Sequence, residues 1–134
     1  MKKLTKEQRS KIMRAIKSKW TKMEQWMRMW LVRKGYRGWV AHKEGMDFVF
    51  PKKKIGIMMM GCFWHCCPKC FRLPKTNRKF WKEKFRKNIQ RDKKLLSKLR
   101  KAKWKIIMIW GHEHKTGGEQ LAKKMKLLEQ YLQK

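Results

Sequence analysis

Acidic residues are scarce in this chain. Its 134 residues include only nine Asp and Glu against 39 Lys and Arg, and the formal net charge is +30 at pH 7. Such a chain repels itself unless a polyanion offsets the charge. Nucleic acid is the leading partner, because neutralising phosphates rewards many cations at once. An anionic membrane surface fits less well, because the cations are spread through the whole chain rather than confined to one amphipathic helix.

Long hydrophobic runs are also missing. No apolar stretch approaches the roughly 20 residues of a membrane-spanning helix. The basic start MKKLTKEQRSK lacks the apolar segment of a secretory signal, so we expect a cytoplasmic protein without membrane contact. No internal repeat or low-complexity linker is present, and the length suits a single domain. Eight Trp and six Phe argue against disorder.

Hydrophobic periodicity predicts helices that alternate with short strands. Thr21 and Glu24 form a capping-box pattern at the start of one helix, and Gly35 ends it. The predicted helices cover about 5–18, 21–35, 78–102 and 119–132. The predicted strands cover 36–41, 47–50, 55–60 and 106–110, with 111–118 as a loop. This alternation favours a layered α/β domain.

All four cysteines fall in one short segment, GCFWHCCPKC. In a cytosolic protein, cysteines more often bind metal or act in catalysis than form disulfides. A C-x-x-C knuckle with a third cysteine nearby is typical of zinc, which prefers four N or S ligands. We predict a structural zinc site in which one histidine completes the set of cysteines. His112 is the expected histidine and His114 is its alternative, and Cys66 is expected to be a plain thiol. The predicted ligands are Cys62, Cys67, Cys70 and His112. The alternative is a set of free buried cysteines, which would be crowded and easily oxidised.

Longer motifs resemble the very short patch repair (Vsr) DNA mismatch endonucleases. GCFWH, CPKC, LPKTN and FWKEKFRKNIQRD occur in this order, after RSKIMRAI, TKMEQWMRMWL and GMDFVF and before KIIMIWGHE. The resemblance covers roughly residues 5–115. It implies a restriction-endonuclease-like α/β core, a central mixed sheet flanked by helices, and a structural zinc. Members of this family use Mg²⁺ to nick DNA beside a T:G mismatch, which arises when 5-methylcytosine deaminates.

The resemblance also implies an organisation and a set of partners. Residues 1–134 would form a single nuclease domain, with a DNA-contacting helix over 1–20, the core over 21–115 and a C-terminal helix over 116–134. The expected partner is double-stranded DNA with a T:G mismatch. Mismatch-repair proteins are candidate partners, and a monomer associated with the nucleoid is expected.

Three side chains match the family's catalytic residues. Asp47 matches the metal-binding aspartate, and Mg²⁺ prefers hard oxygen ligands of this kind. The resemblance adds the backbone carbonyl of Met59 as a second ligand. His65 matches the catalytic histidine, a general base or water-orienting group, and Glu24 matches an active-site glutamate. Taken without the resemblance, Glu24 caps its helix, Asp47 is a solvated turn acid and His65 is a further zinc-ligand candidate.

A second set of residues matches positions that contact DNA. Apolar side chains inserted between bases cost a few kcal/mol of unstacking, which is least at a mispaired step. Core packing is the alternative for the aromatic residues, and a solvated helix face is the alternative for Lys84. The matching residues are Met13, Phe63, Trp64, Trp81, Lys84 and Asn88.

Two other functions are compatible with the same residues. One is a zinc-containing DNA-binding module of the same fold with impaired catalysis, and the other is a basic RNA-binding protein. The chain departs from the family pattern at Met46, Met60 and Cys66, where relatives often have proline, a polar residue and glycine. The presence of Glu24 and Asp47 in a chain with so few carboxylates favours the mismatch endonuclease.

Overall fold

The computed structural model describes residues 5–15 and 20–134, without the side chains of residues 9 and 12–15. The elements are α1 (Lys6–Ala15), α2 (Lys22–Arg33), β1 (Val40–Lys43), β2 (Met46–Phe50), β3 (Ile55–Met60), α3 (Arg78–Lys101), β4 (Lys105–Trp110), α4 (Gly111–Thr116) and α5 (Glu119–Gln133). The strands form one sheet in the order β1-β2-β3-β4, antiparallel except for the parallel pair β3–β4. The predicted mixed α/β architecture is therefore confirmed.

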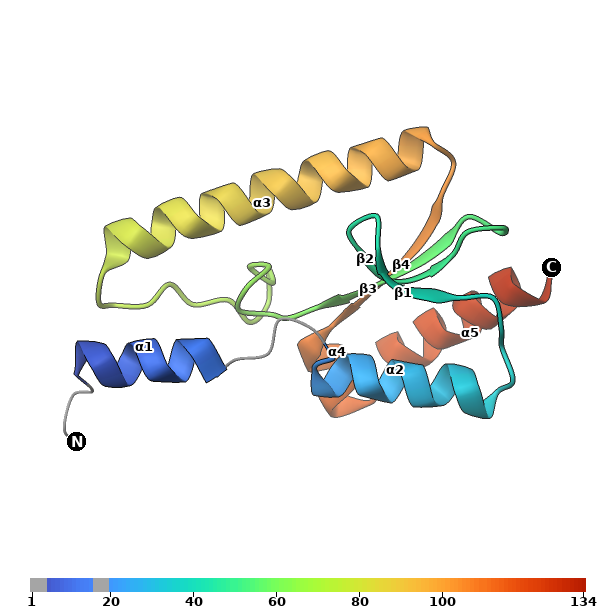
Figure 1. The fold of residues 1–134 in the computed structure, drawn as a ribbon, viewed down its shortest axis with the longest axis horizontal. Helices are drawn as coiled ribbons and strands as arrows, with labels where there is room; N and C mark the ends of the chain where they lie inside the picture. Colours follow the sequence, from blue (N-terminus) through green and yellow to red (C-terminus); the bar gives the residue numbers. More distant parts are fainter. Residues whose placement is uncertain (1–4, 16–19) are drawn as a thin grey trace.

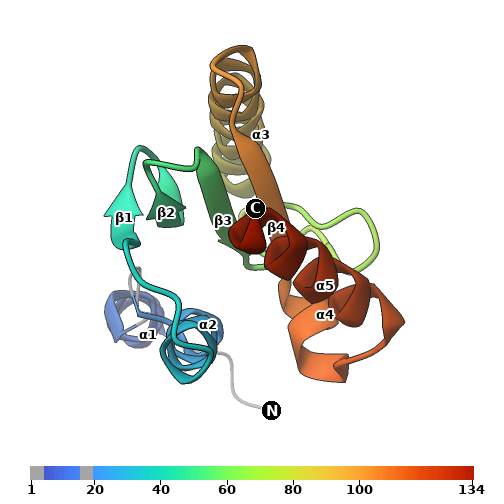
Figure 2. The ribbon, with the colours of Figure 1, turned by 90° about the vertical axis from the view of Figure 1, so that its right-hand side faces the viewer.

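Helices cover both faces of this sheet. Figure 1 shows α3 along one side, and the view turned by 90° places the strands between α3 and the pair α2 and α5 (Figure 2). The segment 61–77, α1 and the first half of α3 extend past the sheet on the same side (Figure 1). No helix within residues 5–15 and 20–134 is long and apolar enough to cross a membrane.

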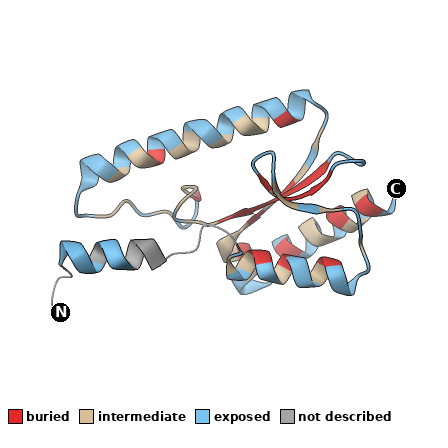
Figure 3. Ribbon diagram, viewed as in Figure 1, coloured by how far each residue is buried: buried red, intermediate tan, exposed pale blue. Residues whose placement is uncertain are grey.

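Each face of the sheet has its own apolar core, and buried residues gather on the strands and on the inner sides of α2 and α5 (Figure 3). The strand β3 serves both cores, because successive side chains point to opposite faces. Met59 belongs to the core under α2 and α5, whereas Met58 and Met60 belong to the core under α3. The run of three methionines is thus divided between two cores, which flexible thioether side chains can fill.

Several predicted boundaries are wrong. The strand predicted over 36–41 begins only at Val40, because Gly38 has a φ of +85° and interrupts the extended chain. The loop predicted over 111–118 contains α4. Its first turn is stabilised by Glu113, whose carboxylate accepts the backbone N–H of Trp110 at 2.9 Å. The predicted helix over 5–18 is observed as α1, and residues 16–18 lie outside the described residues.

A tight hairpin joins β1 to β2. Lys43 pairs with Met46, and the two residues between them, Glu44 and Gly45, have φ values of +55° and +80°. Positive φ at both central residues is the geometry of a type I′ turn, which matches the twist of paired strands. The turn fixes the register that holds the start of β2 beside the end of β1.

Substitution of Gly56 by alanine should destabilise the fold. A methyl group at Gly56 would collide with the Sδ atom of Met46, which fills the space over the glycine. We expect Gly56→Ala to lower the free energy of unfolding by about 1–3 kcal/mol in urea denaturation, the usual cost of overpacking. In a double-mutant cycle, Gly56→Ala should lower the free energy of unfolding by less in a Met46→Ala background than in the wild type. Equal losses in the two backgrounds would show that Met46 is not the cause.

Candidate functional site

A cluster of two carboxylates and an imidazole lies where α2 meets the β1–β2 hairpin. Glu24 comes from the first turn of α2, His42 from β1 and Asp47 from β2. One potential ligand atom from each of the three side chains lies within 4.8 Å of the other two. Glu24 is only 4% exposed, so its carboxylate needs polar partners inside the protein. The structure therefore brings Glu24 and Asp47, two of the predicted catalytic residues, into one group.

Glu24 both caps its helix and belongs to the cluster. The hydroxyl of Thr21 accepts the Glu24 N–H at 3.4 Å, which is half of a capping box. The other half is moved by one residue, because Glu24 Oε2 accepts the backbone N–H of Trp20 at 2.7 Å. The same oxygen lies 2.8 Å from His42 Nε2. Glu24 thus caps its helix and belongs to the cluster at the same time, and its active-site role stays a prediction.

The carboxyl group of Asp47 has a pKa above its usual range. Burial is the main cause, and the charge of Glu24 adds to it, so that the pKa of Asp47 is raised to about 6. The backbone N–H of Met59 donates to Asp47 Oδ2 at 2.7 Å and opposes the shift. A bound cation would stabilise the ionised form of such a carboxylate. The role of the Met59 carbonyl stays a prediction.

The raised pKa predicts that Asp47→Asn stabilises the protein near pH 8. The folded chain binds more protons than the unfolded chain between pH 3.8 and about 6, so the stability that Asp47 contributes falls as pH rises through this window. We expect the variant to gain about 2 kcal/mol in urea denaturation without added Mg²⁺. The gain should shrink towards zero near pH 4. A gain that is independent of pH would contradict this electrostatic origin.

His65 is paired with a carboxylate that the sequence did not point to. Its Nδ1 lies 2.7 Å from Asp92 Oδ2, and both side chains are mostly buried. An imidazole that donates Nδ1–H to a carboxylate keeps Nε2 as the proton acceptor. The pair has the arrangement of an oriented general base.

The helix α3 holds the loop that carries His65. Asn88 donates its side-chain N–H to the backbone carbonyl of Trp64 at 3.1 Å, and Asp92 lies one helical turn further on beside His65. Two neighbouring loop residues are therefore fixed by one face of α3. Asn88 has a structural contact here in addition to the base contact predicted for it.

A second potential metal cluster contains the four predicted zinc ligands. Its ligand atoms lie within 4.8 Å of one another, which suits a tetrahedral site of three sulfurs and one nitrogen. His112 Nδ1 lies 3.4 Å from the sulfur of Cys62 and 3.4 Å from that of Cys67. Cys66 is outside this group, and His114 instead packs against Trp26 with ring centroids 4.9 Å apart. The cluster consists of Cys62, Cys67, Cys70 and His112.

The thiols of this cluster lie close enough to shift the pKa of one another. Desolvation and hydrogen bonds with the thiols of Cys62 and Cys67 raise the pKa of Cys70 to about 11. A thiolate-binding cation would release such protons, so metal affinity at this cluster should increase with pH.

Aromatic rings gather between the cysteine loop and the start of α3. Phe63 is 38% exposed and lies at the centre of the group, with its ring centroid 5.0 Å from Trp64 and 5.6 Å from Trp81. Phe85 belongs to the same group and is buried, with its ring centroid 5.1 Å from that of Phe63. The predicted DNA-contacting aromatics therefore form one cluster, and part of their surface serves packing.

The open side of this aromatic cluster is rimmed by Phe80 and Lys84. Phe80 is 58% exposed, the most exposed of the large hydrophobic side chains in the described residues. The ammonium of Lys84 lies 5.3 Å from the ring centroid of Trp64 and 5.9 Å from that of Trp81, within the range of cation–π contacts. The side chain of Met13, also predicted to contact DNA, lies outside the described residues.

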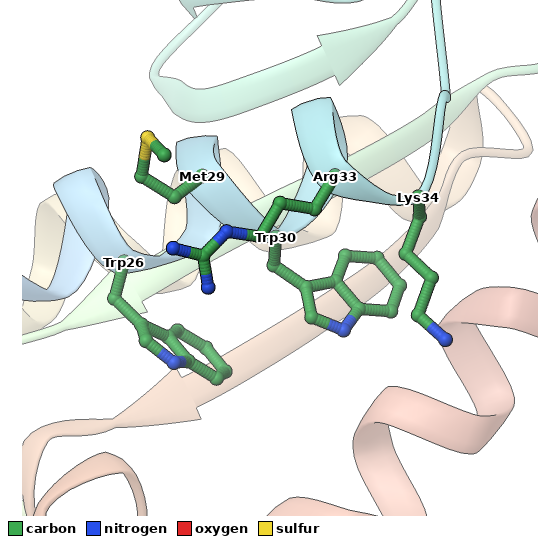
Figure 4. A pocket seen from close by; sticks show the side chains of 5 residues that line it. All are labelled: Trp26, Met29, Trp30, Arg33 and Lys34. Atoms are coloured by element: carbon green, nitrogen blue, oxygen red, sulfur yellow. The ribbon is translucent and has the colours of Figure 1, made fainter.

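The outer surface of α2 carries a pocket without catalytic groups (Figure 4). Lys34 at its edge pairs with Glu129 of α5 at 3.2 Å and lies over the ring of Trp30. No lining residue belongs to either potential metal cluster. The pocket is lined by Trp26, Met29, Trp30, Arg33 and Lys34.

Sequence reasoning missed His42 and Asp92. Each meets its partner through tertiary contact, 18 residues from Glu24 for His42 and 27 residues from His65 for Asp92. A weak signal was present, because the chain has only four histidines and nine carboxylates. Each such residue in a chain this basic is a candidate for a site.

Comparison with known proteins identifies the family. A family model described as DNA mismatch endonuclease Vsr matches residues 1–70. The chain belongs to the Vsr family. The predicted enzyme class, a nicking DNA endonuclease, is confirmed by this membership. The matched residues include Glu24, His42 and Asp47 and all four cysteines, whereas His112 lies beyond them.

Individual Vsr relatives cover most of the chain. The type II nicking enzyme V.NmeAIP of Neisseria meningitidis serogroup A is 39% identical over 84% of this chain and 83% of its own length. The type II nicking enzyme V.NaeI of Lentzea aerocolonigenes is 35% identical over 78% of this chain and 68% of its own length. The DNA mismatch endonuclease Vsr of Escherichia coli K12 is 36% identical over 76% of this chain and 68% of its own length.

Proposed function

We propose that this chain nicks one strand of double-stranded DNA beside the T of a T:G mismatch, in a hydrolysis that depends on Mg²⁺. Membership of the Vsr family supports the reaction, and the cluster of Glu24, His42 and Asp47 is the observation that carries it. We also propose that residues 1–134 form one domain, with a restriction-endonuclease-like core over residues 21–115 between an N-terminal and a C-terminal helix. The mixed four-stranded sheet with helices on both faces supports this part of the proposal.

The carboxylate cluster has the chemistry of a divalent-cation site. Asp47 and the backbone carbonyl of Met59 would hold Mg²⁺, and Glu24 lies in the same cluster. When bound there, Mg²⁺ would polarise the phosphoryl group and stabilise negative charge on the leaving oxygen. His65 orients or deprotonates the attacking water through Nε2, because Asp92 holds its Nδ1.

The cysteine cluster has a structural role in this proposal. Zn²⁺ bound by Cys62, Cys67, Cys70 and His112 would tie the loop after β3 to the start of α4. That loop carries Phe63, Trp64 and His65. The zinc would therefore fix the orientation of the two aromatic rings and of the catalytic imidazole without taking part in the reaction.

The aromatic cluster supports recognition of a mispaired step. Phe63, Trp64 and Trp81 present exposed ring surface beside the ammonium of Lys84, which would lie near phosphate or base edges. Wedging rings between bases costs least where pairing is already weak. Asn88 would contact the mismatched bases, as Met13 would from α1.

Asp92→Asn should slow nicking without removing metal binding. The amide cannot hold the imidazole of His65 in the same charge state, so proton transfer becomes less efficient. We expect the single-turnover rate in Mg²⁺ to fall by between about 10- and 100-fold, with a shifted pH profile. Ser97→Ala, on the exposed side of α3, is the matched control and should leave the rate unchanged.

Strand mapping tests the proposed function. Duplexes with a T:G mismatch, or a C:G pair in its place, are end-labelled on each strand and incubated with the protein, with and without Mg²⁺. We expect one nick beside the mismatched T, only with Mg²⁺. Binding of the mismatch without a nick would establish an impaired DNA-binding module instead, and preference for structured RNA would establish an RNA-binding protein.

A further inference from the structure

His42, the histidine of the carboxylate cluster, has no role in the proposed reaction. His42 lies within β1, between the paired positions Ala41–Phe48 and Lys43–Met46. Continuing that register places His42 opposite Asp47. Its Nε2 lies 2.8 Å from Glu24 Oε2. The His42 imidazole thus lies near two carboxylates from two other elements and within hydrogen-bond distance of that of Glu24.

The backbone at His42 is held in a costly conformation. Its φ is +53°, in the left-handed region, although the residue lies inside a strand rather than in a turn such as that at Glu44. This conformation is unfavourable for a residue without the freedom of glycine, and such conformations gather at functional sites. Trp20 packs edge-on against the imidazole, with ring centroids 4.9 Å apart, and holds the ring over the cluster.

The spacing of the three groups fits coordination of one ion. In an octahedral site with ligand atoms about 2.1 Å from the ion, neighbouring ligand atoms lie about 3 Å apart. The 2.8 Å between His42 Nε2 and Glu24 Oε2 agrees with one edge of that octahedron, as it does with a hydrogen bond. All three ligand atoms lie within 4.8 Å of one another. Ligand atoms on opposite sides of one ion lie about 4.2 Å apart, so shifts of a few tenths of an ångström bring all three into reach of a single ion.

We propose that His42 is a ligand of the divalent cation at this site, together with Asp47 and Glu24, and that the site binds Mn²⁺ more tightly than Mg²⁺. The inference rests on the proposed function, because it concerns the same metal site. Mg²⁺ takes oxygen ligands and holds imidazole poorly, whereas first-row transition-metal ions accept nitrogen and oxygen together. The nitrogen ligand therefore sets the metal preference of the nuclease.

Pulsed electron paramagnetic resonance of Mn²⁺ tests the proposal on the zinc-loaded full chain. A ¹⁴N coupling from imidazole should be present in the wild type, lost in His42→Gln and retained in His65→Gln. Glutamine keeps an N–H donor for Glu24, so the variant removes the metal ligand but keeps the hydrogen bond. In competition titrations, we expect the preference for Mn²⁺ over Mg²⁺ to be at least about tenfold in the wild type and to disappear in His42→Gln.

Several results would overturn the proposal. They are Mn²⁺ bound to the wild type without ¹⁴N coupling, no Mn²⁺ binding at about millimolar concentration, or a coupling and a preference that survive in His42→Gln. If His42→Gln does not fold, which zinc content and circular dichroism would show, the wild type and His65→Gln decide the matter: a coupling lost in His65→Gln would assign it to His65 and overturn the proposal. Nicking is assayed on the same preparations. An imidazole coupling without T:G nicking would contradict the proposed substrate and leave His42 as a ligand.

Discussion

Asp47→Asn is expected to abolish nicking of a T:G duplex while mismatch binding persists. The carboxylate is the group through which β2 would hold the catalytic cation beside the phosphate, and an amide is a much weaker ligand. Loss of a metal-derived stabilisation of several kcal/mol corresponds to a decrease of about 10³-fold or more in the single-turnover rate. Gel assays in Mg²⁺ measure the rate, and fluorescence anisotropy measures the binding.

Glu44→Gln provides the matched control for this variant. Glu44 lies in the turn that precedes β2 and is exposed, so the change removes one negative charge from the same hairpin but leaves the cluster intact. Its nicking rate should stay close to that of the wild type. If Asp47→Asn retained most of the wild-type rate, the carboxylate cluster would not be the catalytic site.

Cys67→Ala should remove the zinc and destabilise the whole cysteine loop. Cys67 is buried at 1% exposure, and its sulfur lies 3.4 Å from His112 Nδ1, so it is the ligand least able to be replaced by water. Because binding of a structural metal is folding free energy, we expect zinc content to fall to near zero. The free energy of unfolding should fall by about 3–5 kcal/mol.

The neighbouring thiol allows a close control. Cys66 is adjacent in sequence but outside the cluster, so Cys66→Ala should keep its zinc and lose less than about 1 kcal/mol. Metal analysis and thermal denaturation of the two variants measure the difference directly. Equal zinc loss in both, or retention of zinc by Cys67→Ala, would contradict the assignment of the ligands.

Local patterns predicted most of the elements and missed those that depend on tertiary contact. The capping signal at Thr21 and the apolar run of β4 predicted α2 and β4, because propensity and burial agree there. The sequence of the short helix α4 predicts a loop, because it is polar and because its first turn depends on Glu113, which pairs with Lys124 of α5 at 2.6 Å. A short polar helix stabilised in this way has no local signal.

The candidate site shows the same division. The spacing of Cys67 and Cys70 pointed to a metal from a few residues of sequence, whereas His112 could be separated from His114 only once the fold placed it beside the cysteines. The family motifs indicated Asp47 and His65. The partners of the site residues, His42 and Asp92, arrive from β1 and α3, and no pattern within either segment predicts where they meet.

A competition assay measures the preference of the protein for a T:G mismatch. Wild-type protein is given T:G and C:G duplexes of one sequence, with distinct labels, in one tube with Mg²⁺ at about 0.15 M salt, so that non-specific binding by this basic chain is screened. We expect a nick beside the T of the T:G duplex, with kcat/KM at least about 100-fold above that of the C:G duplex. Equal cleavage of both duplexes, or no cleavage of either, would contradict the account.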